Sequence, residues 1–338
     1  MVGLIVFSNN SGIGLQSRRL CYALRPDRIL AIDSSGFSKN KEQHLEWYTG
    51  FRGYITKGFP TNREIEVFCR GLTKIFVVEN PMNFHLLKVC RDNNIKLYIQ
   101  SNYEFCDHLN RDLILPTKFL MPSYWKIDEM KTRFGDDKVI YLPPPINPSE
   151  FTKSRERNFR RNGKRYLHII GTIAAADRNG TLSIIEALKQ SKGDFEIIIR
   201  SQHALSDEYI TSDRRVKYEI VDMKDTADMY YDFDAVILPR RYGGLSLVCN
   251  EALMSGLPVI MTDISPNNQL LPQKWLIPAS KTSEMMTRTT IPIYSVDTTL
   301  LARYLDNIHI TQNDKIQAFE LAYDQFSETV LIPTYSKL

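Results

Sequence analysis

Two adjacent glycines that precede a predicted helix could bind a diphosphate in this chain. Gly243 and Gly244 follow an apolar run at residues 235–238, and Glu251 lies in a helical pattern that ends before Pro258. Glycine has no Cβ, so its backbone amide can approach a ligand closely, and the start of a helix favours anions. The stretch predicts a strand, a diphosphate-binding glycine loop and a helix. Glycines that serve only packing are the alternative.

The sequence PRRYGGLSLVCNEALMSGLP at residues 239–258 resembles the nucleotide-sugar loop of retaining GT-B glycosyltransferases. That family's pattern is Glu-Gly-Phe-Gly-Leu, three variable residues, Glu-Ala and then Gly-x-Pro-Val; the matching positions are Gly244, Leu247, Glu251, Ala252, Gly256, Pro258 and Val259. The first Glu falls on Gly243, the Phe on Leu245 and the second Gly on Ser246. The resemblance implies that Glu251 binds the ribose hydroxyls of the donor, since a carboxylate accepts from two hydroxyls at once. It also implies altered recognition of the donor sugar, which the missing first Glu contacts in the family.

A cation in the predicted loop at residues 171–180 is expected to meet the donor diphosphate. The family carries an Arg and a Lys in this loop, which fall on Thr172 and Asn179 of this chain. Both charges are therefore displaced, and Arg178 is the only cation left in the loop. We assign Arg178 to the diphosphate because a guanidinium can bind it bidentately. Asn179, in place of the family's Lys, joins the predicted donor site.

The residues just before the glycine pair complete the predicted donor site. Arg240 and Arg241 follow the predicted strand, and Tyr242 separates them from the glycines. Arg241, together with its neighbour Arg240, is expected to supply the second positive charge for the diphosphate. The resemblance implies a nucleotide sugar, expected to be a UDP-sugar, as co-substrate and no resident cofactor.

The N-terminal stretch contains a second glycine loop. An apolar run at residues 4–7 precedes Gly12 and Gly14, and a helical pattern follows them. In GT-B enzymes a similar loop faces the acceptor and the donor phosphates, so the resemblance implies donor contacts for these two glycines. A plain tight turn is the alternative. The loop lacks the third glycine of a dinucleotide site, and we therefore exclude NAD binding.

Polar residues after the predicted strand at residues 95–99 are candidates for the acceptor side. Asn102 and Glu104 follow this strand, and ligands of parallel α/β sheets bind at the carboxyl ends of the strands. We expect Glu104 to contact or deprotonate the acceptor hydroxyl, with Asn102 beside it. A helix cap or a local ion pair for Glu104 is the alternative.

Alternating strand and helix patterns predict an α/β protein with doubly wound parallel sheets. At 338 residues the chain exceeds a usual single core, which favours two domains. The resemblance implies the GT-B fold, in which two Rossmann-like domains face a central cleft. We predict an acceptor domain at residues 1–148, joined by a crossing helix at 312–338, and a nucleotide-sugar domain at 149–311. The prolines at 143–145 mark the boundary.

Positive charge is concentrated directly after this boundary. Residues 151–165 hold seven basic residues and one acidic residue, whereas the whole chain has a net charge of +4. Such a run is either the solvated face of a linker or a patch that lines the acceptor cleft and contacts phosphates.

The acceptor is predicted from a further resemblance. The stretch YGGLSLVCNEAL, with DRNGT before it and DISPNN after it, resembles GT-B transferases of bacteriophages. Some of these glycosylate hydroxymethylated pyrimidines in phage DNA, which implies a DNA base flipped into the cleft as acceptor. The alternatives are a protein or polysaccharide acceptor, and a non-catalytic GT-B protein that binds a nucleotide sugar or nucleic acid.

Metal binding and membrane insertion are not expected. Asp232 and Asp234 form a DxD sequence, but they precede an apolar run, whereas the metal motif of GT-A enzymes follows a strand. The six histidines lack metal-ligand spacing, and the five cysteines lack CxxC spacing and are interpreted as buried thiols in a reducing compartment. No stretch approaches the roughly 20 apolar residues of a membrane span. We therefore expect a soluble cytoplasmic protein, in the host cytoplasm if phage-encoded.

Overall fold

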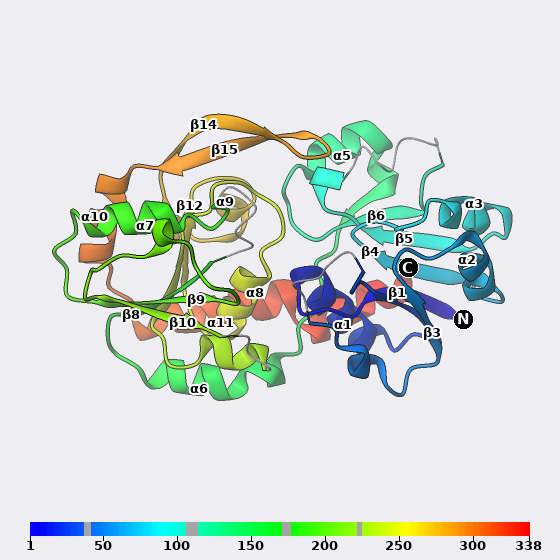
Figure 1. The fold of residues 1–338 in the computed structure, drawn as a ribbon, viewed down its shortest axis with the longest axis horizontal. Helices are drawn as coiled ribbons and strands as arrows, with labels where there is room; N and C mark the ends of the chain where they lie inside the picture. Colours follow the sequence, from blue (N-terminus) through cyan, green and yellow to red (C-terminus); the bar gives the residue numbers. More distant parts are fainter. Residues whose placement is uncertain (37–41, 106–113, 171–176, 222–224) are drawn as a thin grey trace. The chain divides into compact units, whose positions relative to one another are not determined.

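The computed structural model describes residues 1–36, 42–105, 114–170, 177–221 and 225–338, and it contains two compact units (Figure 1). Unit 1 comprises Met1–Ile146, Met286–Thr289 and Glu328–Leu338, and unit 2 comprises Asn147–Met285 and Thr290–Ser327. Each unit is built on one parallel sheet flanked by helices. The predicted α/β class with two Rossmann-like parallel sheets is confirmed.

Unit 1 contains a seven-stranded parallel sheet with the order β3-β2-β1-β4-β5-β6-β7. Its strands are β1 (Val2–Phe7), β2 (Arg28–Asp33), β3 (Gly53–Lys57), β4 (Lys74–Val78), β5 (Lys96–Gln100), β6 (Lys118–Met121) and β7 (Val139–Tyr141). Its helices are α1 (Gly12–Leu24), α2 (Asn62–Cys69), α3 (His85–Asp92), α5 (Ile127–Phe134) and α12 (Glu328–Lys337), with short 3-10 turns at Leu45–Tyr48, Tyr103–Phe105 and Asp136–Lys138.

Both faces of this sheet are covered, and the interiors of its central strands are apolar runs. Ile5 and Phe7 of β1 point into a core shared with α2, α3 and α5. Leu4 and Val6 point to the opposite face, into a core with α1 and with Tyr335 of α12. Continuous apolar runs are typical of parallel sheets covered on both sides, and they explain why these strands could be recognised in the sequence.

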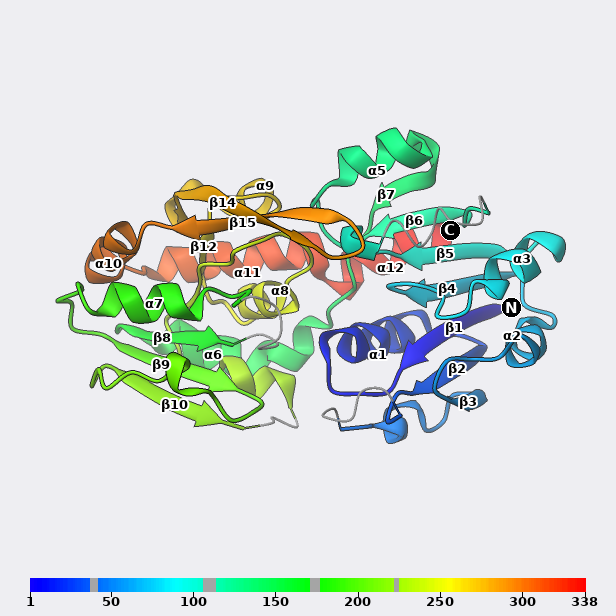
Figure 2. The same cartoon turned by 45° about the horizontal axis from the view of Figure 1, so that its top comes forward.

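Unit 2 contains a six-stranded parallel sheet with the order β10-β9-β8-β11-β12-β13. Its strands are β8 (Arg165–Ile169), β9 (Glu196–Ser201), β10 (Val216–Ile220), β11 (Ala235–Leu238), β12 (Val259–Thr262) and β13 (Leu276–Ile277). Its helices are α6 (Thr152–Arg160), α7 (Thr181–Leu188), α8 (Leu247–Met254), α9 (Asn267–Leu270), α10 (Thr298–Asn307) and α11 (Gln312–Phe326), with 3-10 turns η4 (Pro148–Phe151), η5 (Asp207–Tyr209), η6 (Thr226–Tyr230) and η7 (Gln273–Trp275). Strands β14 (Ala279–Met286) and β15 (Thr290–Val296) form a separate two-stranded ribbon (Figure 2).

The helices of unit 2 fall into two groups. From β8 the chain moves outward to β9, and from β11 it moves in the opposite direction to β12. Right-handed crossovers that run in opposite directions place their helices on opposite faces of the sheet. Accordingly α7 packs with α10, whereas α8 packs with α11, which also contacts α6. Helix α11 belongs to unit 2, so the return of the chain to unit 1 begins at Glu328 and not at the expected residue 312.

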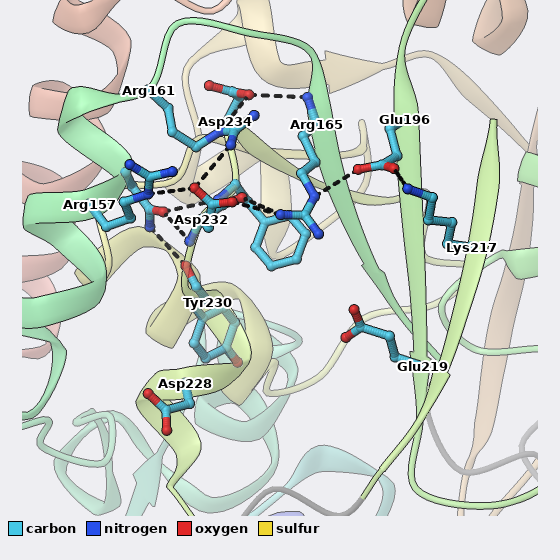
Figure 3. Close-up of polar contacts among 12 residues, drawn as sticks. Arg157, Arg161, Arg165, Glu196, Lys217, Glu219, Asp228, Tyr230, Asp232 and Asp234 are labelled. Carbon is cyan, nitrogen blue, oxygen red and sulfur yellow. Dashed lines mark hydrogen bonds and ion pairs between the residues drawn. The ribbon is translucent and has the colours of Figure 1, made fainter.

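The basic run at residues 151–165 is neither a linker nor a free cationic patch. Most of it forms α6, and three of its arginines pair with the two carboxylates of the DxD sequence (Figure 3). Arg157 and Arg161 contact Asp232 at 2.6 and 3.0 Å. Arg161 also contacts Asp234 at 3.2 Å, and Arg165 contacts Asp232 at 2.7 Å. These internal ion pairs correct both interpretations of the run and account for the DxD sequence without a metal.

A buried lysine joins this network from α11. The ammonium of Lys315 is 2% exposed and lies 3.0 Å from Asp234, which is 1% exposed. It also donates to the carbonyls of Asn158 and Arg161 at 2.9 and 3.0 Å. Burial opposes ionisation of Asp234, but the backbone N–H of Arg165 and the Lys315 ammonium outweigh it and hold the pKa of this carboxyl below its usual value. The pair attaches α11 to the sheet.

We expect Lys315→Ala to destabilise unit 2 by about 3 kcal/mol, because it leaves a buried carboxylate without one of its cations. Urea unfolding followed by circular dichroism measures the change. Lys281→Ala is the matched control, since Lys281 forms only an exposed pair with Glu284 at 2.5 Å and its loss should leave the unfolding curve unchanged. Equal stability of the Lys315 and Lys281 variants would contradict the role of the buried pair.

Candidate active site

The loops that follow the two central strands of the unit 2 sheet are placed to bind a ligand. Strands β8 and β11 are neighbours, and the chain leaves them in opposite directions. Ligands of open parallel sheets bind at such a switch point, outside the carboxyl ends of the strands. The loop after β11 is described in full. Of the loop after β8, Thr172 and its neighbours at residues 171–176 lie outside the described residues, and the part from Asp177 to Gly180 is described.

The loop after β11 has the predicted form of strand, glycine turn and helix. Gly244 has a φ of +97°, a left-handed conformation that favours glycine. Leu245 follows half-buried, and Ser246 then caps α8 by accepting the N–H of Cys249 at 3.2 Å. Gly256, after α8, has a φ of +70°, and a Cβ there would lie 2.4 Å from the ring of Phe159. Close packing thus requires a glycine at position 256, whereas the left-handed backbone conformation of the turn favours a glycine at position 244.

The structure brings Arg178 into contact with the glycine loop. Its Nη2 donates to the carbonyl of Gly243 at 3.1 Å, and its guanidinium lies 4.9 Å from the ring centroid of the buried Tyr242. Arg240, which is 2% exposed, donates to the same Gly243 carbonyl at 3.4 Å. Two guanidinium groups from different loops therefore converge on one peptide, where they can bind a polyanion such as a diphosphate.

The two other predicted polar residues of this site serve mainly the loop architecture. The buried Asn179 donates its Nδ2 to the carbonyl of Ile169, at the end of β8, at 2.7 Å. Arg241 donates its N–H to the Arg178 carbonyl at 2.9 Å, and its own carbonyl accepts from Tyr294 of β15 at 2.7 Å. Its Nε also donates to the Tyr294 carbonyl at 3.4 Å. Arg241 thus links both loops to β15.

The start of α7 is occupied by a carboxylate of the chain itself. Asp177 accepts the N–H of Thr181 at 2.8 Å and that of Leu182 at 3.0 Å. Gly180 has a φ of +75°, and a Cβ there would lie 2.2 Å from the carbonyl oxygen of Pro239, so the helix start packs against the end of β11. Two of the amides that a phosphate could use at this helix are therefore occupied by Asp177. Sequence analysis missed this cap, although an Asp just before an apolar helical pattern is a recognised signal.

A buried histidine holds the same helix against the sheet. His168 of β8 is fully buried, with Nδ1 2.7 Å from the Ile237 carbonyl and Nε2 2.8 Å from the Thr181 hydroxyl. A carbonyl only accepts, so Nδ1 carries the proton and Nε2 accepts from Thr181. Burial lowers the pKa of His168, against the opposing effects of the Ile237 carbonyl and of Asp177. The imidazole is therefore neutral in the folded chain.

Glu251 lies on α8 with its side chain almost entirely buried. The residue is 2% exposed, and its Oε2 accepts from the hydroxyl of Tyr230, the last residue of η6, at 2.5 Å. Tyr230 is fully buried as well. Sequence analysis missed Tyr230, because no local pattern connects η6 with a helix that follows a different strand.

The remaining predicted residues lie in unit 1. Gly12 is the first residue of α1. A Cβ at Gly14 would lie 1.7 Å from the Asn9 carbonyl oxygen, so close packing is sufficient to require a glycine there. Asn102 donates to Glu79 at 3.2 Å. Among the described residues, Oε2 of Glu104 is buried without a hydrogen-bond partner. A buried oxygen that lacks a partner is available to a ligand hydroxyl.

Metal ligands and membrane spans were also sought among the described residues. In this part of the chain, no three His, Cys, Asp or Glu side chains are grouped so as to hold a metal ion. None of the described helices has the length and apolar character needed to cross a membrane.

Comparisons with known proteins relate this geometry to a family. Residues 164–291 match the family model of group 1 glycosyl transferases. No curated protein sequence matches the chain. Similar solved structures include HepE of Anabaena in complex with UDP and glucose, with 12% identity, a TM-score of 0.70 and coverage of 100% of this chain and 99% of HepE. A glycosyltransferase of Rickettsia africae ESF-5 has 12% identity, a TM-score of 0.69 and coverage of 99% and 96%. Sucrose-phosphate synthase of Thermosynechococcus elongatus has 11% identity, a TM-score of 0.69 and coverage of 99% and 97%. At such low identity this likeness shows the fold.

The neutral His168 makes the stability of unit 2 depend on pH. Its pKa lies below the ordinary 6.5 in the folded chain, so between the two values the unfolded chain binds a proton that the folded chain does not. The free energy of unfolding should therefore fall as pH drops below about 6.5, by up to about 1.4 kcal/mol per pH unit. Urea unfolding between pH 7.5 and 5 measures this slope. His168→Gln should have a shallower slope, and an equal slope in both proteins would assign the effect to other groups.

Proposed function

We propose that this chain is a glycosyltransferase of group 1, and that it transfers a sugar from a nucleoside-diphosphate sugar to an acceptor hydroxyl with retention of anomeric configuration. The bond between the anomeric carbon and the diphosphate oxygen breaks, and a bond to the acceptor oxygen forms on the same face of the sugar. The products are the glycosylated acceptor, a nucleoside diphosphate and a proton.

The observation that carries the proposal is the contact between two loops at the switch point of unit 2. Arg178, from the loop after β8, donates to Gly243, in the loop after β11, at 3.1 Å. Both loops follow the carboxyl ends of neighbouring strands, which is where a parallel sheet binds nucleotides. The contact brings a permanent cation to a glycine turn that precedes a helix.

We assign the donor diphosphate to this cationic turn. The amides of Gly243 and Gly244, with Arg178 and Arg240 beside them, would bind the two phosphates and meet the negative charge that develops when the diphosphate leaves. Glu251 would accept the ribose hydroxyls, since an ionised carboxylate has acceptor positions on both oxygens. HepE is described with UDP and glucose, and a UDP-sugar is therefore the first donor to test.

The acceptor is proposed separately from the donor. The resemblance of the glycine stretch to phage transferases supports a hydroxymethylated pyrimidine in DNA, with Asn102 and Glu104 of unit 1 as the acceptor-side residues. The basic run at residues 151–165 no longer supports DNA, because Arg157, Arg161 and Arg165 are paired with carboxylates. A protein or polysaccharide acceptor therefore belongs in the same experiment.

A transfer assay tests both halves of the proposal. Purified protein is incubated with UDP-, GDP- and ADP-sugars and with plain DNA, hydroxymethylpyrimidine DNA or a protein extract, and products are identified by mass spectrometry. We expect one donor to release free nucleoside diphosphate and one acceptor to gain a sugar. Arg178→Ala should lower the rate about 100-fold, while Arg303→Ala, an exposed arginine of α10, should not change it. Donor binding without any release or transfer would favour the non-catalytic alternative.

The ribose assignment predicts the effect of Glu251→Ala. Loss of a charged acceptor for the ribose hydroxyls should weaken binding of the nucleoside diphosphate about 10- to 100-fold. Isothermal titration calorimetry measures the Kd, and Glu320→Ala, an exposed carboxylate of α11, is the control. An unchanged Kd in a folded Glu251 variant would overturn the assignment.

A further inference from the structure

We propose that Tyr230 is a positioning residue of the donor site, which holds the carboxylate of Glu251 in the orientation that binds the two ribose hydroxyls. The inference rests on the proposed role of Glu251 and adds a residue from outside the glycine stretch. It predicts that Tyr230 contributes specifically to the recognition of ribose, and not to the binding of the base or the phosphates.

The contact itself is short and buried. The Tyr230 hydroxyl donates to Oε2 of Glu251 at 2.5 Å, and the two residues are 0% and 2% exposed. A hydrogen bond from a hydroxyl to a carboxylate oxygen constrains the orientation of the carboxyl group. The bond therefore fixes the plane of the Glu251 carboxylate.

Tyr230 is held rigidly by α6. The side-chain amide of Asn158, which is fully buried, donates to the Tyr230 carbonyl and to the Ser255 carbonyl, each at 2.9 Å. Its Oδ1 accepts the N–H groups of Asp232 and Phe233, each at 3.0 Å. One amide thus ties the end of η6 to the end of α8, the helix that carries Glu251.

Two further contacts fix η6 itself. The hydroxyl of Ser154 on α6 donates to the Ala227 carbonyl at 2.7 Å, and the Phe151 ring lies 6.1 Å from the Tyr230 ring. In Figure 3, the backbone of Tyr230 lies next to the Asp232 cluster, and its ring points away from the arginines. The ion pairs of α6 therefore lie on the same short segment as the tyrosine, and they stabilise the position from which its hydroxyl reaches Glu251.

The hydroxyl has a role that packing does not explain. A phenylalanine would fill the same space, and burying a hydroxyl without a partner costs free energy. This hydroxyl donates to the carboxylate that the donor site is proposed to use. Without the hydroxyl, the Glu251 carboxylate would lose a constraint on its orientation, and ordering it on ligand binding would cost affinity.

Tyr230→Phe tests the inference, because it removes one oxygen and keeps the ring. The probes are the ribonucleoside diphosphate that binds best in the donor panel and its 2′,3′-dideoxy counterpart, and calorimetry gives the Kd of each. In the wild-type protein we expect the dideoxy compound to bind at least 30-fold more weakly. In Tyr230→Phe this ratio should shrink about 5- to 10-fold, because only the ribonucleotide loses affinity.

The control is Tyr231→Phe. Tyr231 is the next residue, but it is 37% exposed and its ring lies 5.3 Å from Lys153, so its variant should keep the wild-type ratio. Equal weakening of both nucleotides in Tyr230→Phe would indicate a general structural role and overturn the inference.

Glu251→Ala separates this inference from the proposed function. If Glu251→Ala abolishes discrimination between the two nucleotides and Tyr230→Phe retains it in full, Tyr230 does not position the carboxylate, although the ribose assignment stands. If Glu251→Ala leaves the discrimination intact, the ribose assignment itself fails, and the inference about Tyr230 fails with it.

Discussion

The pairing of β8 with β11 is the constraint on which the candidate site depends. Tyr166 and Leu167 of β8 lie opposite Ala235 and Val236 of β11, and this short register joins two halves of the sheet that grow in opposite directions. Because both strands are parallel, the loops that leave them start side by side, whatever their separation in sequence. The contact between Arg178 and the glycine turn follows from this topology. The same topology sends α7 and α8 to opposite faces, so each loop ends in its own helix.

The positively charged side chains of unit 2 form two groups: one stabilises the fold through ion pairs, and the other lies at the candidate site. The carboxylates of Asp232 and Asp234 are surrounded by the arginines of the α6 region and by Lys315, and buried charges of this kind persist only when they are paired. That network uses much of the positive charge that is conspicuous in the sequence. The cations that remain beside the glycine turn are fewer, but they lie at the switch point. The net charge of a sequence stretch therefore predicts little about a binding surface until the ion-pair partners of its residues are known.

Local signals predicted most of the fold, and long-range contacts explain what they missed. The strand, glycine turn and helix around Gly244 could be recognised because an apolar run, two adjacent glycines and a helical pattern follow one another within a few residues. The basic run was misinterpreted because its partner carboxylates lie more than 65 residues away, as for Arg165 and Asp232. Tyr230 is separated from Glu251 by 21 residues and an entire strand, and only the folded sheet reveals their contact.

The cap at α7 changes how a diphosphate could be bound. In many α/β proteins the amides at a helix start bind the phosphate, but here Asp177 accepts two of them. A second anion at that position would meet a carboxylate and would be repelled. Phosphate binding would then depend on guanidinium groups and on the turn at Gly243. The carbonyl of Gly243 accepts a hydrogen bond from Arg178. Arginine remains charged at every physiological pH and binds through a fixed fork of donors. Such a site depends on the placement of side chains, and that placement depends in turn on the hydrogen bonds that link the two loops to each other and to β15.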